Sequence, residues 1–253
     1  MNLPGSMMIA FSMYSRIPVP QVQWTKERMK YAMCFFPLIG AVIGLLEYGA
    51  ILLLRTLGFP FLEQILPVVI PVVVTGGIHM DGLLDVIDAK SSHSETEKKL
   101  EILNDPHTGA FAIIGCGIYF LFYLAFFMEM RPDMIPAFCI TFVITRALSG
   151  LAVVTFPMAK KNGLAAAFSD GAHKRVVGTV MVLYLIISLL AVWLLTGALA
   201  VLGVFTVSFA VFIYYYHMSK REFGGITGDL AGYFLQVLEL VLVIGLAILS
   251  HMK

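Results

Sequence analysis

Charged residues are scarce in this sequence. Asp, Glu, Lys and Arg together make up 13% of its 253 residues, whereas a water-soluble domain carries about 25%. Hydrophobic residues reach 59%, and the mean hydropathy is +0.90. The charged residues are too few to cover the surface of a soluble globule, and the hydrophobic residues are too many for a disordered chain. The sequence therefore predicts that lipid surrounds much of the protein.

Cysteine is also scarce, because only Cys34, Cys116 and Cys139 occur, each inside an apolar segment. None of them has the C-x-x-C spacing of a metal site, and they are too few for a disulfide framework. We expect them to be small buried apolar side chains. The net charge is +1, so the total charge gives no reason to expect a nucleic-acid partner.

Long apolar runs, by contrast, are abundant. Seven of them are predicted to cross a membrane as helices, at residues 31–54, 61–79, 110–129, 133–155, 176–197, 198–218 and 229–250. Residues 6–15 are too few to cross and are predicted to lie in the membrane interface. Residues 1–253 are thus predicted to form a single all-α domain, a polytopic membrane bundle of about seven transmembrane helices plus short interfacial and loop helices.

Basic residues are distributed unevenly around these runs. If the N-terminus is cytoplasmic, thirteen of them fall on the cytoplasmic side, three on the other side, and Arg146 inside a span. The thirteen are Arg16, Lys26, Arg28, Lys30, Lys90, Lys98, Lys99, Lys160, Lys161, Lys174, Arg175, Lys220 and Arg221, and the three are Arg55, Arg131 and Lys253. Because basic loops stay in the cytoplasm, this asymmetry supports the seven spans. The acidic clusters fall on the same side, which favours an enzyme or a one-sided binding site over a channel.

Residues 76–88, GGIHMDGLLDVID, contain the densest group of reactive side chains. In a helix, Asp81, Asp85 and Asp88 stand at i, i+4 and i+7 and lie within roughly 60° of one another. Magnesium would neutralise such a stripe, since it takes hard carboxylate oxygens and leaves positions for substrate phosphates. A solvated helix face is the alternative, but three acids beside a span, a Gly-Gly pair and His79 favour a metal site.

A second polar element, LEILNDPHTG, occupies residues 100–109. Pro106 disfavours helix at Asp105, so a short helix is expected to end there. Taken alone, Asn104 and Asp105 are more typical of a turn at a helix end than of a ligand site.

A third element, KREFGGITGD, occupies residues 220–229. Glycines at a helix start can expose backbone N–H groups to a phosphate, and Lys220 and Arg221 add positive charge. The pattern Gly-Gly-Ile-x-x-Asp occurs both at 76–81 and at 224–229. This repetition predicts two similar anion-binding corners that face one cleft.

Three ionisable residues, Glu47, Arg146 and Glu239, fall inside predicted spans. A charge at membrane depth is costly, so it usually pairs, lines a wet cavity or takes part in function. A structural ion pair between Arg146 and one glutamate is one interpretation. Glu239 stands about three helical turns beyond Asp229, so the alternative is that it faces the same cavity.

Taken together, these elements resemble the cobalamin synthase family, the adenosylcobinamide-GDP ribazoletransferases. The segments that carry the resemblance, in chain order, are FSMYSRIPVP (11–20), FPLIG (36–40), TGGIHMDGLLDVID (75–88), LEILNDPHTG (100–109), Thr145-Arg146, AKKNGL (159–164) and GGITGD (224–229) with Glu239. The resemblance extends from one end of the chain to the other.

The resemblance implies a magnesium-dependent enzyme of the prokaryotic cytoplasmic membrane that joins adenosylcobinamide-GDP to α-ribazole or its 5′-phosphate and releases GMP. We expect Asp81, Asp85, Asp88, Asp105 and Asp229 to bind Mg²⁺, and Asp81 and His79 to act in catalysis. The expected substrate-binding residues are Gly76, Gly77, Gly82, Asn104, His107, Arg146, Lys220, Arg221, Gly224, Gly225, Thr227, Gly228 and Glu239. The resemblance leaves room for contacts with other cobamide-pathway enzymes and for a homo-oligomer.

Two other classes of protein remain alternatives. Other membrane transferases of diphosphate substrates, the CDP-alcohol phosphotransferases and prenyltransferases, also use aspartate-rich helices with magnesium. A secondary transporter would explain Glu47, Arg146 and Glu239, but it predicts charges near the midplane and inverted repeats. In this sequence most acids cluster at one surface instead.

Overall fold

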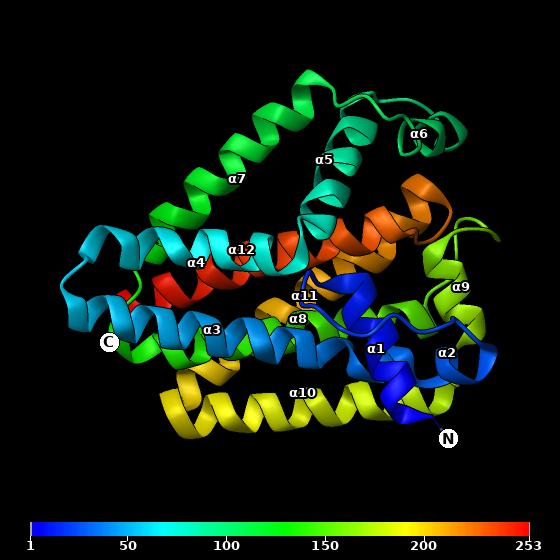
Figure 1. Cartoon of the computed structure of the whole chain (residues 1–253). Helices are drawn as coiled ribbons and strands as arrows, with labels where there is room; N and C mark the ends of the chain where they lie inside the picture. Colours follow the sequence, from blue (N-terminus) through cyan, green and yellow to red (C-terminus); the bar gives the residue numbers. More distant parts are fainter. Residues whose placement is uncertain (1, 253) are drawn as a thin grey trace.

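The computed structural model describes residues 2–252, and every regular element within them is helical (Figure 1). The helices are α1 Leu3–Tyr14, α2 Lys26–Ala32, α3 Phe36–Leu57, α4 Pro60–Thr75, α5 Ile78–Ser91, α6 Thr96–Ile102, α7 Ala110–Met128, α8 Ile135–Thr155, α9 Leu164–Gly171, α10 Lys174–Thr196, α11 Ala198–Phe223 and α12 Gly228–His251, with short 3-10 helices η1 Met33–Phe35 and η2 Pro132–Met134. The all-α prediction is confirmed. Lys253, counted above among the basic residues, lies outside the described range.

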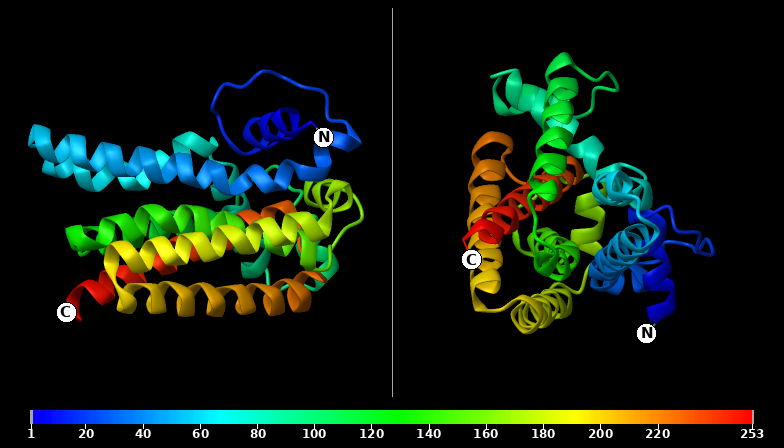
Figure 2. Two further views of the ribbon diagram at one scale, coloured as in Figure 1. Left: turned by 90° about the horizontal axis from the view of Figure 1, so that it is seen from below. Right: turned by 90° about the vertical axis from the view of Figure 1, so that its left-hand side faces the viewer.

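Six helical segments of the described chain are long and apolar enough to cross a membrane, and a seventh is added if α4 and α5 count as one broken span. Their long axes run in a similar direction (Figure 2). The six are Lys26–Leu57, Ala110–Met128, Pro132–Thr155, Lys174–Thr196, Ala198–Phe223 and Gly228–His251. This confirms a multi-pass helical bundle of about seven spans.

The second predicted span, 61–79, is wrong at its end. Helix α4 stops at Thr75, and α5 begins at Ile78 and is turned by 96°. Gly76 and Gly77 make this corner with φ values of 67° and 79°, a left-handed conformation that costs glycine little. Helix α5 therefore crosses the direction of the long helices (Figure 1), and we treat it as lying outside the membrane-spanning segments.

Helix α8 is buried in the centre of the bundle, where α3 packs closely against it. A Cβ atom on Gly40 would lie 2.1 Å from the Phe142 carbonyl oxygen, and one on Gly44 would lie 2.2 Å from that of Cys139. Small residues spaced by four let two membrane helices approach in this way. Glu47 on α3 and Arg146 on α8 are both fully buried.

Helix α5 crosses the start of α12 at two glycines. A Cβ atom on Gly82 would lie 2.5 Å from the backbone oxygen of Asp229, and one on Gly232 would lie 3.0 Å from that of His79. No larger residue fits at either position without moving a backbone. This crossing brings the acidic segment of α5 next to the first turn of α12.

We predict that Gly82→Ala destabilises the protein by about 1–3 kcal/mol, the usual cost of overpacking a tight contact. The matched control is Gly178→Ala in α10, because a Cβ atom there would meet nothing within 4 Å. That control should be neutral, or more stable by up to about 1 kcal/mol, since alanine favours helix. Thermal unfolding in detergent measures both, and equal midpoints for the two variants would contradict the close crossing.

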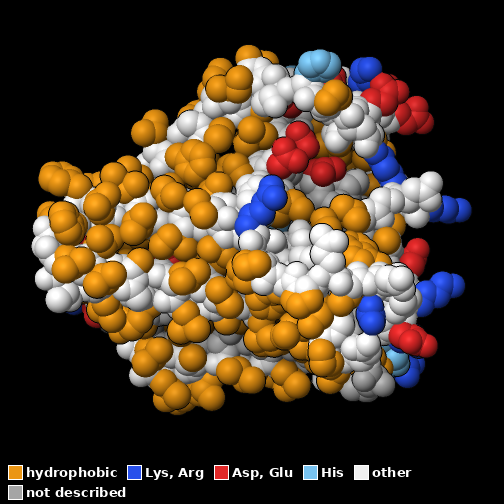
Figure 3. All heavy atoms as spheres, in the orientation of Figure 1, with side chains coloured by type: hydrophobic (Ala, Val, Ile, Leu, Met, Phe, Trp, Pro, Cys, Tyr) orange, Lys and Arg blue, Asp and Glu red, His pale blue; other side chains and the backbone are white. Residues whose placement is uncertain are grey.

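Charged side chains gather at one end of the molecule. On the face shown in Figure 3, hydrophobic side chains cover the long helices, whereas most Lys, Arg, Asp and Glu lie at the end formed by α2, α6 and α9. Helix α1 lies at the same end, with Ile9 and Ala10 buried and Leu3 and Met7 exposed. The interfacial position predicted for residues 6–15 stays a prediction.

Candidate functional site

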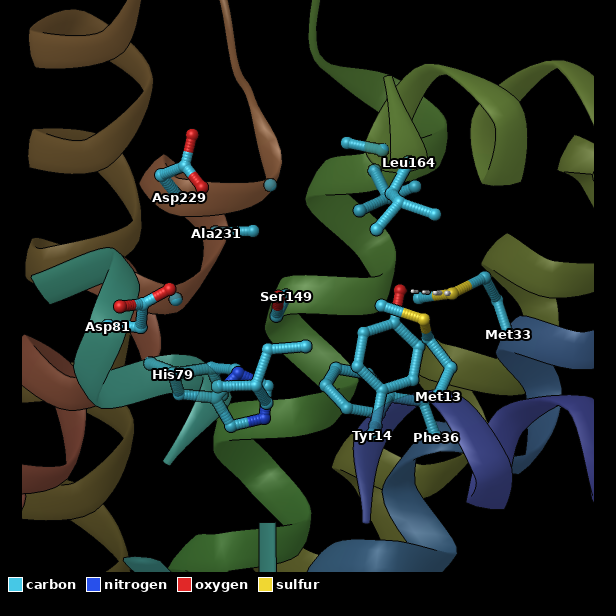
Figure 4. Close-up of a pocket in the computed structure, with 16 residues that line it drawn as sticks. Met13, Tyr14, Met33, Phe36, His79, Asp81, Ser149, Leu164, Asp229 and Ala231 are labelled. Carbon is cyan, nitrogen blue, oxygen red and sulfur yellow. Dashed lines mark hydrogen bonds between the residues drawn. The ribbon is translucent and has the colours of Figure 1, made fainter. Parts of the chain in front are cut away.

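A cavity of about 270 Å³ opens where α5 meets α12. It is lined by residues of α1, η1, α3, α5, α8, α9 and α12. These residues are Met13, Tyr14, Met33, Phe36, Ile78, His79, Asp81, Ser149, Val153, Leu164, Ala165, Gly228, Asp229, Ala231, Gly232 and Leu235. We call it the acidic cavity because Asp81 and Asp229 lie on one side of it (Figure 4).

Asp81 and Asp229 reach the acidic cavity from two equivalent places. Asp81 stands in the first turn of α5, and Asp229 in the first turn of α12. Each follows a Gly-Gly-Ile corner, so the two repeated segments place their aspartates in one cavity, as the sequence predicted. The glycine pairs themselves do not line it.

Asp85 lies one turn further along α5 and is half-buried. Burial, together with the negative charges of Asp81, Asp229 and Asp88, raises the pKa of its carboxyl to about 7. The acids are thus crowded enough to disfavour a full set of negative charges. Among the described residues, however, no three His, Cys, Asp or Glu side chains are arranged to hold a metal ion by themselves.

Asp88 has a structural partner. One carboxylate oxygen accepts the backbone N–H of Gly109 at 2.5 Å, and the other accepts that of Ala112 at 2.8 Å. Gly109 is the residue before α7 and has no side chain that could accept a hydrogen bond from the first N–H groups of that helix. Asp88, which stands on α5, accepts these hydrogen bonds instead. A carboxylate at a helix start also complements the helix dipole.

We predict that Asp88→Ala lowers the free energy of unfolding by about 1 kcal/mol, the typical value of a helix cap. Asp88→Asn retains one acceptor oxygen and should lose less. Thermal unfolding in detergent compares the two variants. An unchanged midpoint in both, together with lost metal dependence, would show that Asp88 is a ligand and not a cap.

His79 lines the cavity and is only 4% exposed. Its ring stacks with Tyr14 at a centroid distance of 6.2 Å, and its Nε2 atom has no hydrogen-bond partner among the described residues. Burial and then the positive charge of Arg146 lower the pKa of His79 to about 3. The imidazole is therefore neutral at physiological pH.

Asp105 is exposed and bonds within its own loop. It accepts the backbone N–H of His107 at 2.9 Å and contacts the Nδ1 atom of that residue at 2.7 Å. These hydrogen bonds lower the pKa of Asp105. Neither side chain lines the acidic cavity, so their predicted roles stay predictions. The expected turn is present, because Asn104 and Asp105 donate to the carbonyls of Glu101 and Ile102.

A polar pocket of about 170 Å³ adjoins the acidic cavity. Asn104, Lys160 and Asn162 line it, and it shares Gly228 and Asp229 with the acidic cavity. Lys160 also donates to the backbone oxygen of Leu100 at 3.2 Å, which ties the α8–α9 loop to α6. The acidic cavity and the polar pocket therefore meet at Asp229, and the cationic side chain of Lys160 lines the polar pocket.

The corner at 224–228 is held by its backbone. Gly224 ends α11 with a φ of 75°, and a Cβ atom on Gly225 would lie 2.6 Å from the Pro157 carbonyl oxygen. Thr227 caps α12 by accepting the N–H of Leu230 at 3.2 Å. These residues have structural roles here, and phosphate contacts by the glycines stay predictions.

Lys220 and Arg221 are exposed at the end of α11. The Lys220 ammonium lies 5.7 Å from the centre of the Tyr216 ring. Neither basic residue lines the acidic cavity or the polar pocket. Their predicted contact with substrate therefore stays a prediction as well.

Arg146 and Glu239 form an ion pair inside the bundle, with both side chains buried. Arg146 also donates to Thr145 Oγ1 at 3.0 Å. Glu47 is also buried, and neither of its carboxylate oxygens has a hydrogen-bond partner among the described residues. None of the three lines the acidic cavity, so the structure agrees with the ion-pair interpretation, and substrate contact stays a prediction.

Several cavity residues were not predicted as site residues. Tyr14 and Phe36 line its apolar side, and Lys160 and Asn162 line the polar pocket. A signal for them was present, because all four lie in segments 11–20, 36–40 and 159–164, which carry the resemblance. The sequence alone could not show that these four residues lie near one another in the folded protein.

Comparison with known proteins agrees with these segments. A family model described as cobalamin-5-phosphate synthase matches residues 6–247. A Lachnoclostridium phytofermentans protein named adenosylcobinamide-GDP ribazoletransferase is 47% identical over 248 residues, covering 94% of this chain and 91% of that protein. Proteins of the same name from Clostridium botulinum and Clostridium perfringens are 32% and 30% identical, covering 95% and 91% of this chain and 96% and 92% of theirs.

No solved structure matches this chain. The family match, however, covers the whole of α5 and most of α12, the two helices that carry Asp81 and Asp229. The relatives also cover more than nine-tenths of the chain. This chain belongs to the cobalamin-5-phosphate synthase family.

Proposed function

We propose that this protein is a membrane transferase that joins adenosylcobinamide-GDP to α-ribazole or its 5′-phosphate. The products are adenosylcobalamin or its 5′-phosphate, and GMP, so the reaction assembles the nucleotide loop of a cobamide. The observation that carries the proposal is the 47% identity, over 94% of the chain, to a protein named for this transfer. We propose that the reaction takes place in the acidic cavity.

The reaction has simple requirements. A ribose hydroxyl oxygen of α-ribazole forms a bond to the phosphorus next to the cobinamide, and the bond from that phosphorus to the oxygen of GMP breaks. The hydroxyl proton leaves, and the leaving GMP takes the bridging oxygen with its electrons. Positioning and charge neutralisation account for most of the catalysis of such transfers.

We assign the reacting phosphates to the acidic cavity beside Asp81 and Asp229. The adjoining Lys160 would offset negative charge on the nucleotide side, because it lines the pocket that shares Asp229. Burial of His79 leaves a neutral imidazole near Asp81. A carboxylate that lines this cavity, Asp81 or Asp229, is placed to accept the hydroxyl proton.

We further propose Mg²⁺ as the cofactor. The donor set fits, because Asp81, Asp85 and Asp229 supply hard oxygens and their mutual charge has no cation among the cavity-lining residues. Since no three donors are already assembled, substrate phosphate and water would complete the shell. The ion would supply charge neutralisation on the diphosphate when bound.

The proposed location is the cytoplasmic membrane of a prokaryote, with the N-terminus and the acidic cavity on the cytoplasmic side. The thirteen-to-three distribution of basic residues supports this orientation. The charged end of the molecule in Figure 3 would face the cytoplasm.

The test is a coupling assay on membranes that contain this protein. Adenosylcobinamide-GDP, α-ribazole 5′-phosphate and Mg²⁺ are supplied, and mass spectrometry follows GMP and the corrinoid product. We expect both products in equal amounts, and neither without added metal after chelation. Folded protein that forms neither product would refute the proposal, and CDP-alcohols and prenyl diphosphates would then be the substrates to test.

A further inference from the structure

The acidic cavity has a second end that is aromatic. Tyr14, Met33, Phe36 and His79 line it, and Figure 4 places the labelled Tyr14, Met33 and Phe36 away from Asp81 and Asp229. We call these four residues the aromatic end. They come from α1, η1, α3 and α5, so four separate elements build this surface.

The rings of the aromatic end pack against one another. Tyr14 and Phe36 have centroids 4.5 Å apart, and Tyr14 stacks with His79 at 6.2 Å with the ring planes inclined by 21°. The ring of Phe168 also packs against Tyr14, with centroids 5.5 Å apart. A flat apolar ligand would find rigid faces here, because aromatic faces favour stacked or edge contacts with another ring.

Hydrogen-bonding groups are few at this end. The Tyr14 hydroxyl lies 4.0 Å from the sulfur of Met33. The Nε2 atom of the buried His79 has no partner among the described residues. A buried nitrogen of this kind costs free energy unless a ligand or water satisfies it. The aromatic end therefore suits a ring with a single hydrogen-bonding atom.

The substrates offer three bulky groups, and only one fits this description. The corrin ring is far too large for a cavity of about 270 Å³. Guanine carries several donors and acceptors on its edges, which an apolar surface would leave unsatisfied. The base of α-ribazole is a flat, methylated bicycle with one free ring nitrogen, so it matches both the faces and the single nitrogen.

We propose that the aromatic end binds the base of α-ribazole, stacked on Tyr14 and Phe36, with its free ring nitrogen hydrogen-bonded to His79. The ribose then extends toward Asp81 and Asp229, where the phosphates react. This assignment rests on the proposed function for the identity of the ligand. In this assignment, Tyr14 and His79 determine which base the protein binds.

Three variants test the assignment. Tyr14→Leu removes the ring, whereas Tyr14→Phe retains it and removes only the hydroxyl. His79→Phe retains a ring but removes the nitrogens. We expect the KM for α-ribazole to rise about tenfold or more in Tyr14→Leu, from loss of base stacking, and several-fold in His79→Phe, from loss of one hydrogen bond. The KM for adenosylcobinamide-GDP should change less than the KM for α-ribazole in both variants, and Tyr14→Phe should keep the wild-type KM for α-ribazole.

Equilibrium dialysis of α-ribazole against the purified protein gives the same comparison without any reaction. If the wild type binds α-ribazole and Tyr14→Leu does not, the assignment stands even where coupling fails, so the two proposals can fail separately. An unchanged affinity for α-ribazole in both Tyr14→Leu and His79→Phe would overturn it. Loss of affinity for adenosylcobinamide-GDP instead would place guanine at the aromatic end and also overturn it.

Photolabelling of the wild-type protein avoids variants that fail to fold. An azido derivative of the benzimidazole riboside should label peptides that contain Tyr14 or Phe36, and excess α-ribazole should prevent the labelling. Label confined to peptides outside α1, α3 and α5 would contradict the proposal. An azido-guanine derivative that labels Tyr14 in competition with adenosylcobinamide-GDP would contradict it too.

Discussion

Asp81→Asn is expected to lower kcat by about 10²–10³-fold, the usual effect of removing one charge-stabilising group from an active site. The side chain keeps its size and loses its charge, and it is exposed at the start of α5, so the fold should persist. The coupling assay measures the rate at several magnesium concentrations. We expect the variant to need more magnesium for its residual activity.

Asp170→Asn is the matched control for Asp81→Asn. Both are exposed aspartates, but Asp170 stands on α9 and lines neither the acidic cavity nor the polar pocket. We expect this control to retain most of the activity. If Asp81→Asn kept the wild-type rate and magnesium dependence, the acidic cavity would not be the place of reaction.

Arg146→Met is expected to destabilise the protein by about 3–5 kcal/mol, because it leaves Glu239 buried without its partner. Both side chains are buried in the bundle. Glu239→Met should cost a similar amount for the same reason. Thermal unfolding in detergent and the yield of folded protein measure the effect.

The double variant Arg146→Met/Glu239→Met separates a structural role from a role in binding. Replacing both partners of a buried pair by apolar residues is often nearly neutral, so the double variant should recover much of the stability. If the pair is only structural, activity returns with stability. Activity that stays lost in a stable double variant would show that Arg146 or Glu239 acts on the substrate.

The sequence predicted the helical bundle because its signals are local. Apolar runs of about twenty residues set the spans, and the break between α10 and α11 was placed correctly at Gly197. The error at 61–79 has a clear cause: hydropathy continues through Ile78, whereas the direction of the chain changes at Gly76 and Gly77. Hydropathy reports which residues tolerate lipid, and it does not report a left-handed corner.

The candidate site was predicted only in part. The repeated Gly-Gly-Ile-x-x-Asp pattern predicted two anion-binding corners that face one cleft. The structure has Asp81 and Asp229 in one cavity, but the glycine pairs do not line it, and anion binding stays a prediction. The role of Asp88 at α7 was missed, since it depends on Gly109 lying beside α5 in space. Tyr14 was not predicted as a site residue for the same reason, because its ring contacts His79 only in the folded chain.

The central claim is that the acidic cavity holds the reacting diphosphate through a divalent cation. Because the described side chains do not form a metal site by themselves, tight cation binding should need the substrate. Titration of purified protein with Mn²⁺, followed by electron paramagnetic resonance, tests this directly. We predict weak binding to the protein alone, tight binding with adenosylcobinamide-GDP present, and loss of the tight component in Asp81→Asn and Asp229→Asn. Equally tight binding in the wild type and in both variants would contradict the account.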